Sequence, residues 1–268
     1  MNIKRFVLVA LSISVLLLPI TGMASQTGCP EHFANGIAPD FINQKLTAKS
    51  REICYSGFAI NHSGVTRTPL YAAEHLTRER ILQGKGMKRQ SKFHPDEHLP
   101  RSERAELHHY AKSGYDRGHV APSADMFDIQ SQYECFSLAN MVPQVPENNR
   151  GPWGGIESAV RMIAKSKGDL YVVTGPICLG GDVQQIGDAV MVPTKLFKAI
   201  YDPQRKEAGA YLIDNTADAH PEKISIAELE KITGISIFPS VEENVKSRLM
   251  RLPEPKSYKE RKRMGGRG

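Results

Sequence analysis

Closely spaced cysteines and long internal apolar runs are both missing from this sequence. The four cysteines include no Cys-x-x-Cys pair, which argues against a zinc ribbon or a thioredoxin-type redox site. No His-Glu-x-x-His motif occurs, so the usual helical zinc motif is absent. We find no internal repeat, no interdomain linker and no apolar run beyond the N-terminus that could span a membrane. These absences favour one globular domain.

The composition is that of an ordinary globular protein. Of 268 residues, 40% are hydrophobic and 24% are charged, which excludes a collagen-like, coiled-coil or wholly disordered chain. Lysine and arginine number 35 against 29 acidic residues, an excess of six positive charges. This mild excess suits a polyanionic partner without establishing one.

The N-terminus has the pattern of a secretory signal peptide. A basic start at Lys4 and Arg5 precedes an almost wholly apolar run over 6–20, and small residues precede a cleavage site after Ala24. An uncleaved N-terminal anchor is the alternative. We therefore expect a signal peptide at 1–24, a folded domain at 25–255 and a basic, disordered tail at 256–268, in a periplasmic or secreted protein.

All four cysteines lie in the part that would be exported. An even number in an oxidising compartment predicts two disulfides, for which three pairings exist. We favour Cys29–Cys54 and Cys135–Cys178, because each pair joins neighbouring segments.

Hydrophobic periodicity predicts a mixture of strands and helices. A helix is expected from Pro152 to about residue 166, with a stop at Gly168, and another from Ser225, where Glu228 completes a capping box, to Gly234. The turn at His62–Gly64 would join the first two strands as an antiparallel pair. The expected strands cover 54–60, 68–75, 133–141, 170–177, 189–201 with an interruption at Pro193, and 209–215.

The first of these helices presents charged groups beside its buried edge. At about 100° per residue, Ile156, Val160 and Ile163 form one apolar stripe. Glu157 and Arg161 share the adjacent stripe. An ordinary surface ion pair would also explain these two residues.

The sequence Asp116-Arg117-Gly118-His119 concentrates chemistry in four positions. A histidine can take a proton from water near neutral pH. An arginine can bind a phosphate through two parallel hydrogen bonds, and glycine allows a tight turn or a close approach. A surface turn with ordinary ion pairs is the alternative for these four residues alone.

Phosphodiester hydrolysis needs a base for the attacking water and positive charge on the phosphate and the leaving oxygen, much of which a divalent metal supplies. Mg²⁺ prefers oxygen ligands and keeps several waters. An amide oxygen from Asn149 and a carboxylate from Glu157, acting through water, would form a light but workable site. His119 and Arg117 would supply the base and the phosphate contact.

At this point the sequence resembles the DNA/RNA non-specific endonucleases with the ββα-metal fold. The resemblance covers roughly 50–240. Its motifs, in chain order, are Asp116-Arg117-Gly118-His119 with Ala121-Pro122, then Leu138-Ala139-Asn140-Met141-Val142-Pro143-Gln144, then Asn149-Arg150-Gly151-Pro152-Trp153 with Glu157 and Arg161, then Thr174-Gly175-Pro176 and Val192-Pro193-Thr194. The resemblance implies an α+β fold with a mixed or antiparallel central sheet on which the metal-binding helix packs.

The resemblance also implies residue roles and an activity. His119 would be the general base, and Asn149 the direct ligand of one Mg²⁺, or of Mn²⁺. Glu157 would hold metal-bound water, Arg117 and Arg161 would contact phosphate, and Asn140 would orient groups at the site. The implied reaction is hydrolysis of DNA and RNA to 5′-phosphate products.

Several points stay open. Ala139 stands where the family often has serine, and Asn148 beside Asn149 makes the ligand assignment ambiguous by one position. The loop around Arg89 aligns poorly, so we assign Arg89 no role. The rival functions are a zinc hydrolase that uses loop histidines such as His94 and His108, and a basic nucleic-acid-binding protein without catalysis. The sequence leaves a homodimer and an inhibitor protein undecided.

Overall fold

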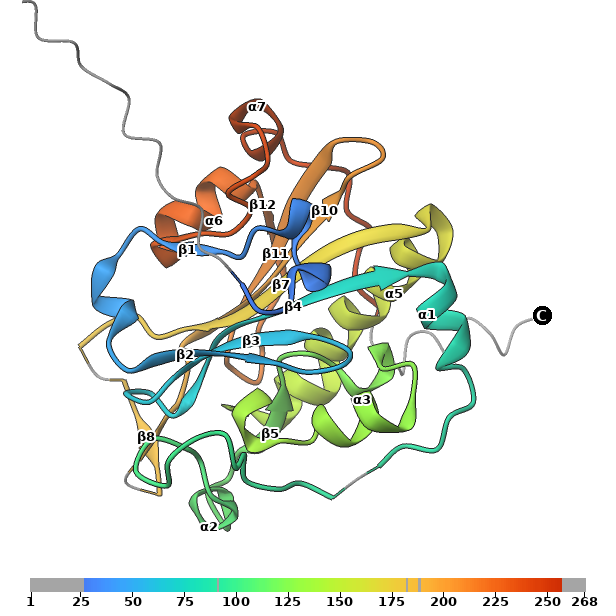
Figure 1. Cartoon of the computed structure of the whole chain (residues 1–268). Coiled ribbons are helices and arrows are strands. Elements are labelled where there is room, and N and C mark those ends of the chain that lie inside the picture. The colour runs from blue at the N-terminus through green and yellow to red at the C-terminus, as the bar shows by residue number, and fades with distance from the viewer. Residues whose placement is uncertain (1–26, 91, 182, 188, 257–268) are drawn as a thin grey trace, which may run out of the picture.

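A seven-stranded antiparallel sheet forms the centre of the molecule (Figure 1). The computed structural model describes residues 27–256 apart from 91, 182 and 188, so the predicted signal peptide and nearly all of the predicted tail lie outside the described residues. The strands, in their order across the sheet, are β12 (Glu222–Ile224), β11 (Glu207–Asp214), β10 (Lys195–Asp202), β7 (Asp169–Ile177), β4 (Thr68–Thr77), β3 (Ala59–Ser63) and β2 (Ser50–Cys54).

Three two-stranded ladders and seven α-helices surround this sheet in the described part of the chain. The ladders pair β1 (Asp40–Phe41) with β13 (Ile235–Ser236), β5 (Asp116–His119) with β6 (Met141–Gln144), and β8 (Gln185–Ile186) with β9 (Val190–Met191). The helices are α1 (Arg78–Gln83), α2 (Leu107–Tyr110), α3 (Ile129–Glu134), α4 (Pro146–Asn148), α5 (Gly154–Lys167), α6 (Ile226–Thr233) and α7 (Glu243–Lys246). None of the helices in this part of the chain is long and apolar enough to cross a membrane.

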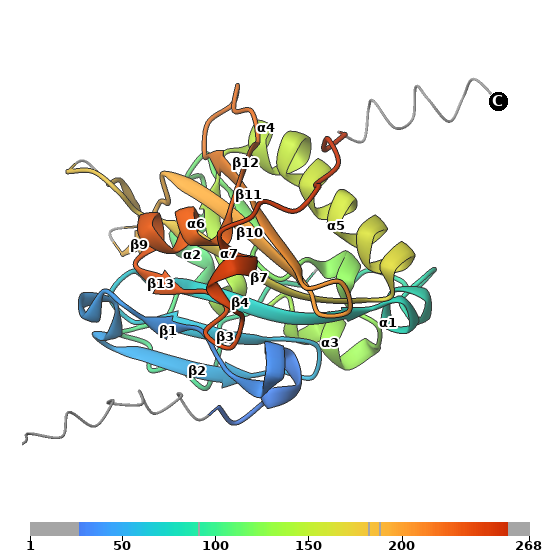
Figure 2. The same ribbon diagram turned by 90° about the horizontal axis from the view of Figure 1, so that it is seen from above.

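Each face of the sheet carries its own hydrophobic core. One core contains Ile156 and Val160 of α5, together with apolar side chains of the α3–β6 region. The other contains Ile226 and Leu229 of α6 with the N-terminal segment. Figures 1 and 2 show α6 and α7 on one side of the sheet and α3 and α5 on the other. The α+β fold with a helix packed on an antiparallel sheet is thus confirmed.

Helix α5 is fixed at both ends and along one edge. Its apolar stripe is buried as predicted, with Ile156 and Val160 fully enclosed. It ends at Gly168, whose φ of 98° is the left-handed conformation that glycine adopts without strain. The Arg78 guanidinium donates to the carbonyls of Lys165 at 2.7 Å and Ser166 at 2.6 Å. These bonds satisfy carbonyls at the helix end that have no partner within the helix.

Two strand predictions need correction. Residues 133–141 are not a strand: Asp128 caps α3 by accepting from the Ser131 amide at 2.7 Å, and the chain then forms a 3₁₀ turn, η5 (Leu138–Asn140). The apolar residues of this stretch lie at the end of a helix and in a turn, and both bury them. The extended strand β6 begins only at Met141. The stretch 54–60, expected as one strand, instead contains the end of β2, a turn over 55–58 and the start of β3. The Tyr55 amide closes this turn by donating to the Phe58 carbonyl at 2.9 Å.

Most other predicted elements are confirmed. Strand β4 pairs antiparallel with β3, although the connecting turn lies over 64–67. Strands β7, β9, β10 and β11 match their expected ranges. Ser225 and Glu228 form the capping box of α6, and Gly234 ends that helix.

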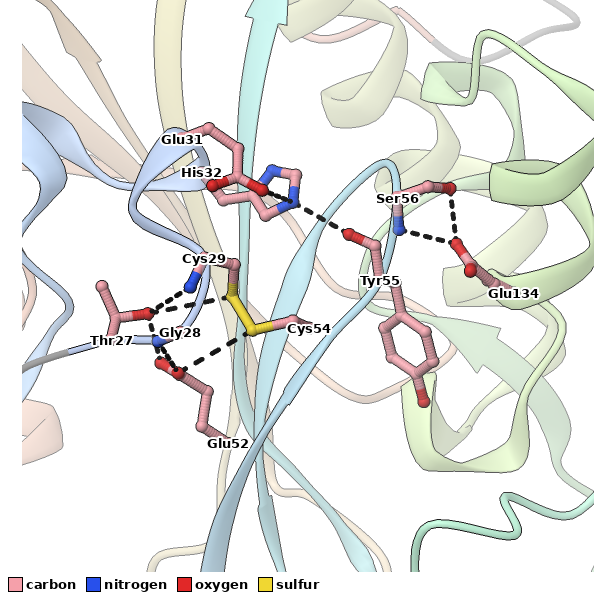
Figure 3. Close-up of a disulfide and its surroundings, with 10 residues drawn as sticks. All are labelled: Thr27, Gly28, Cys29, Glu31, His32, Glu52, Cys54, Tyr55, Ser56 and Glu134. Atoms are coloured by element: carbon pink, nitrogen blue, oxygen red, sulfur yellow. Dashed lines mark hydrogen bonds and ion pairs between the residues drawn. A yellow bond between two sulfur atoms is a disulfide. The ribbon is translucent and has the colours of Figure 1, made fainter.

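One of the two favoured disulfides is present. Cys29 and Cys54 are joined and attach the N-terminal segment to β2 (Figure 3). The predicted Cys135–Cys178 bridge is wrong, because both thiols are free. Cys135 is buried in the core on the α5 side of the sheet and donates to the Gln132 carbonyl at 3.2 Å. Cys178 follows β7 and lines a cavity with Leu46 and Ile235 on the other side.

Candidate active site

The β5–β6 ladder and the start of α5 border one cavity of about 490 Å³. Helix α4 leads through a π-helical turn, η6 (Asn149–Trp153), into α5, so residues from this turn face the ladder. The structure brings four of the predicted site residues together in this cavity: Arg117, His119, Asn149 and Glu157. Asn140 and Arg161 are not among the residues that line it.

Gly118 lets β5 pack closely against the Gln144 side chain of β6. A Cβ atom at this position would lie 2.2 Å from Oε1 of Gln144 on β6. The glycine of the motif therefore serves a close approach between two strands, with Gly118 opposite Val142 in the ladder.

His119 ends β5 in a largely apolar setting. Its ring lies edge-on to Phe136, with ring centroids 4.8 Å apart, and Phe93 lies 5.8 Å away. Nε2 is buried and has no hydrogen-bond partner among the described residues. Burial, together with the positive charge of Arg89, lowers the pKa of His119 to about 3. The imidazole is therefore neutral at neutral pH and can accept a proton.

Asn140 holds the chain that follows His119. Its side-chain amide donates to the carbonyls of Ala121 and Cys135, each at 2.9 Å, and its oxygen accepts from the Ala121 amide at 2.9 Å. The side chain is fully buried, and backbone groups engage both of its ends. Asn140 thus positions the loop that follows His119, the candidate base, and is not among the residues that line the cavity.

The two adjacent asparagines have different surroundings. Asn148 is fully buried: it donates to the Asp214 carbonyl at 2.6 Å and accepts from Gln144 at 2.8 Å. Asn149 lines the cavity, and its amide nitrogen donates to Asp116 at 2.9 Å. No described residue hydrogen-bonds to the Asn149 oxygen. The oxygen available for a ligand is therefore on Asn149.

Asp116 positions other side chains, a role that the sequence did not predict. Besides Asn149, it accepts two hydrogen bonds from the Arg150 guanidinium, at 2.8 and 2.5 Å. Its only sequence signal was its place in the Asp-Arg-Gly-His motif. By holding the amide nitrogen of Asn149, Asp116 determines which way the amide oxygen points.

Glu157 and Arg161 form a charged edge on α5. Burial raises the pKa of Glu157, against the nearby positive charge of Arg161. Arg161 donates to Asp125 at 2.7 Å, and the Asp125 side chain is almost completely buried. Asp125, a second residue that sequence reasoning missed, anchors the guanidinium from η4 (Ser123–Asp125). It follows the Asp-Arg-Gly-His motif closely, which was the only signal available.

Arginine side chains are among the residues that line the cavity. Arg117 lies over the rings of Phe93 and Tyr110, 5.0 and 5.6 Å from their centroids. Arg89, which was left without a role, lies 5.4 Å from the centroid of Phe136 and lines the cavity. Guanidinium groups held on aromatic faces are well placed to bind phosphate.

The donors in the cavity fit a hard divalent cation. Asn149 and Glu157 offer an amide oxygen and a carboxylate, and within the described residues no hydrogen bond occupies either. Oxygen donors of this kind suit Mg²⁺.

The loop histidines do not form a rival metal site. His94 contacts the carbonyls of Tyr133 and Pro95, and His98 contacts Asp96 at 2.8 Å. Among the described residues, Cys29, Glu52 and Cys54 alone form a compact group of potential ligands, and two of these are joined as a disulfide.

Comparisons with known proteins show the family of this chain. The family model of the DNA/RNA non-specific endonucleases matches residues 38–244. The zebrafish "Nuclease EXOG, mitochondrial" is 34% identical over 70% of this chain and 61% of its own length. "Nuclease 1, mitochondrial" of Schizosaccharomyces pombe is 36% identical over 66% of this chain and 62% of its own. A crystal structure of the EndoG/EndoGI complex aligns with a TM-score of 0.67 and 27% identity, covering 74% of this chain and 89% of that one.

These relatives correct the predicted location and show the predicted family. The expected periplasmic or secreted location is contradicted, because relatives from zebrafish, human, fission yeast and budding yeast are named as mitochondrial nucleases. The chain spans somewhat less than two thirds of the zebrafish and fission yeast relatives. The matched segment includes every predicted site residue, and this chain belongs to the DNA/RNA non-specific endonuclease family.

Proposed function

We propose that this chain is a Mg²⁺-dependent endonuclease that hydrolyses phosphodiester bonds of both DNA and RNA. The observation that carries the proposal is the convergence of His119 and Asn149 on one cavity, from separate elements of the chain. A ββα-metal fold implies a divalent ion, and the oxygen donors present favour Mg²⁺, with Mn²⁺ as an alternative.

His119 acts as the general base in this proposal. The neutral imidazole lines the cavity and accepts a proton from the attacking water. In the free protein its proton affinity is low because of burial. A phosphate bound in the cavity brings negative charge close to the ring, which raises that affinity in the complex. Asn140 keeps the loop after His119 in place.

Asn149 is the direct metal ligand in this proposal, and Glu157 holds water molecules of the ion. The ion would supply positive charge to the phosphate and the leaving oxygen. Asp116 fixes the amide of Asn149 by accepting from its nitrogen at 2.9 Å. The outer contacts of a ligand orient it in this manner at many metal sites.

The arginines bind the substrate backbone and stabilise developing charge. Arg117 and Arg89 line the cavity, and Arg161 follows Glu157 by one helical turn with Asp125 as its anchor. Their contacts are to phosphate, which DNA and RNA share, so the site has no basis for choosing between the two sugars. We expect 5′-phosphate products.

The test is incubation of the purified protein with plasmid DNA and with RNA, with Mg²⁺ or with chelator. We expect shortening of both nucleic acids in Mg²⁺ alone. His119→Ala should lower turnover by a factor of about 10²–10⁴ and leave oligonucleotide binding intact, as loss of a general base does. Retardation of DNA on a gel without shortening, in either condition, would support the non-catalytic binding protein. Full turnover by His119→Ala would refute the assignment of the base.

A further inference from the structure

Arg150 is a charged residue of the candidate site that the proposed reaction does not use. It directly follows Asn149 in the turn η6, and it lines the same cavity. Two other arginines, Arg89 and Arg117, also line this cavity, and each lies over an aromatic ring. Arginines from three separate segments of the chain therefore border one cavity.

Asp116 holds the Arg150 guanidinium at this position. The Asp116 carboxylate, on β5, accepts from Nε of Arg150 at 2.8 Å and from one of its Nη nitrogens at 2.5 Å. The same carboxylate accepts from the amide nitrogen of Asn149 at 2.9 Å. A guanidinium that two hydrogen bonds already hold loses less conformational freedom when it binds a further anion. The structure thus shows Arg150 oriented before any ligand arrives.

Three of the five N–H groups of this guanidinium remain available. An arginine carries five such donors, and the two bonds to Asp116 use two of them. Among the described residues, Asp116 provides the only hydrogen-bond acceptors for this side chain, which is 71% exposed. An exposed ion pair contributes at most about 1 kcal/mol to stability. The remaining donors suit an anion that enters the cavity from solvent, and phosphate is the group that arginine binds in this way in nucleic acids.

We propose that Arg150 binds a phosphate of the nucleic-acid backbone next to the one that is cleaved. The cleaved phosphate already has Arg117, Arg161 and the ion held by Asn149 as its proposed contacts. Arg150 is far more exposed than Arg161, whose side chain is only 20% exposed, so Arg150 suits a phosphate farther out. This inference rests on the proposed nuclease function, because it extends the substrate contacts of the same site.

The deciding measurement is the affinity for a fluorescent single-stranded oligonucleotide in chelator, at several salt concentrations. Loss of one phosphate contact should reduce the magnitude of the slope of log affinity against log salt by about 0.7. We expect this loss in Arg150→Gln, and a smaller one in Arg150→Lys, which keeps the charge. In cleavage at saturating Mg²⁺, Arg150→Gln should raise KM and leave kcat unchanged, as expected for a contact that is equally strong in the bound substrate and the transition state.

Two further variants separate a phosphate contact from a general effect of charge. Arg205→Gln removes an arginine that pairs with Asp202 at 3.1 Å and does not line the cavity, so its salt slope should equal that of the unmodified protein. Asp116→Asn/Arg150→Gln removes both charges of the pair and leaves the net charge as it was, and the loss of slope should persist. A slope restored in this double variant would mean that Arg150→Gln acts only by exposing the Asp116 carboxylate, and it would overturn the inference.

An unchanged salt slope in Arg150→Gln, together with a higher Mg²⁺ requirement, would also overturn it, because Arg150 would then only orient Asn149 through Asp116. Equal losses of slope in Arg150→Gln and Arg205→Gln would reduce the effect to net charge and have the same consequence. Absence of metal-dependent cleavage by the unmodified protein would refute the proposed nuclease function. The salt slope in chelator does not depend on cleavage, so the role of Arg150 is tested separately.

Discussion

At the scale of single residues, burial determines the protonation state of the candidate base. His119 is enclosed by aromatic rings, and desolvation makes a charged imidazole unfavourable there. The folded protein therefore resists protonation of His119 down to a pH of about 3, whereas the unfolded chain takes up that proton at the ordinary value near 6.5. A group with a lowered folded pKa of this kind makes the free energy of unfolding depend on pH.

The contribution of His119 to stability decreases as the pH falls. Between the two pKa values the unfolded chain binds more protons, so stability falls as the pH falls through this window. From pH 7 to pH 4.5 we expect His119 to account for a loss of about 2.5 kcal/mol in the free energy of unfolding, at about 1.4 kcal/mol per pH unit below pH 6.5. His119→Asn should lack this part of the loss. Urea unfolding of both proteins at the two pH values measures it, and equal losses would show that His119 is not kept neutral by burial.

The neighbouring asparagines give a matched pair of variants. Asn149→Ala should raise the Mg²⁺ concentration for half-maximal cleavage by at least about tenfold and should change the melting temperature little. Asn148→Ala should lower stability by about 1–3 kcal/mol, because it leaves buried partners unsatisfied, and should have the smaller effect on the metal requirement. Metal titrations and thermal melts on both variants distinguish the two residues. The reverse pattern would move the ligand to Asn148.

Sequence reasoning predicted the residues that would carry the chemistry, and it missed Asp116 and Asp125, which position two of them. His119, Asn149 and Glu157 stand at recognisable spacings in the sequence. Asp116 and Asp125 are ordinary acids until the fold brings Asn149 and Arg161 to them, across 33 and 36 positions of sequence. Such partners depend on tertiary contacts that no local pattern encodes.

At the scale of elements, capping signals predicted helix ends well, whereas two of the six strands predicted from apolar patterns were wrong. The capping box at Ser225 and the stop at Gly168 are local chemistry, and both are confirmed. The strand prediction for 133–141 was wrong because a short apolar run can be buried equally by a strand, a turn or a helix end. Here the Asp128 cap begins α3, and the chain leaves that helix in a turn instead of a strand.

The position of His119, the candidate base, depends directly on the geometry of the β5–β6 ladder. In Gly118→Ala, the added Cβ would overlap the Gln144 side chain, with Oε1 at 2.2 Å and Cβ at 2.8 Å. We expect a loss of about 1–3 kcal/mol in stability, as for an overpacked core, and a larger loss of kcat than of substrate affinity because His119 is the next residue. Gly118→Ala/Gln144→Ala should recover part of both losses.

Gly181→Ala serves as the control for this substitution, because a Cβ atom there meets no other atom within 4 Å. Its melting temperature and kcat should equal those of the unmodified protein. Normal turnover in Gly118→Ala would mean that the close approach of β5 and β6 does not set the position of His119.

At the scale of the whole molecule, the sheet order was beyond sequence reasoning. Strand β4 lies between β3, its neighbour along the chain, and β7, with which it pairs from Ala72–Thr174 to Thr77–Asp169. Nothing local specifies that pairing. The overall fold was predicted from the resemblance to a family, whereas local sequence patterns predicted only single helices and strands.

The Cys29–Cys54 disulfide attaches the N-terminal segment to the edge strand of this sheet (Figure 3). Around it, Glu52 accepts from the Thr27 hydroxyl at 2.8 Å and from the Gly28 amide at 2.9 Å, so the segment keeps polar contacts when the bond is broken. The bond closes a loop with a sequence separation of 25, and for loops of this size the lost chain entropy of the unfolded state is worth about 3 kcal/mol.

We therefore expect Cys29→Ser/Cys54→Ser to lower the free energy of urea unfolding by about 3 kcal/mol. Turnover should be retained, because the active-site cavity has no lining residue from the disulfide region. Cys135→Ala/Cys178→Ala removes the two free thiols and is the matched variant. Thiol labelling of the unfolded, non-reduced protein should find two reactive cysteines in the unmodified chain and none in this variant. Labelling of four cysteines in the unmodified chain would show that the disulfide is absent and that noncovalent contacts alone hold the N-terminal segment.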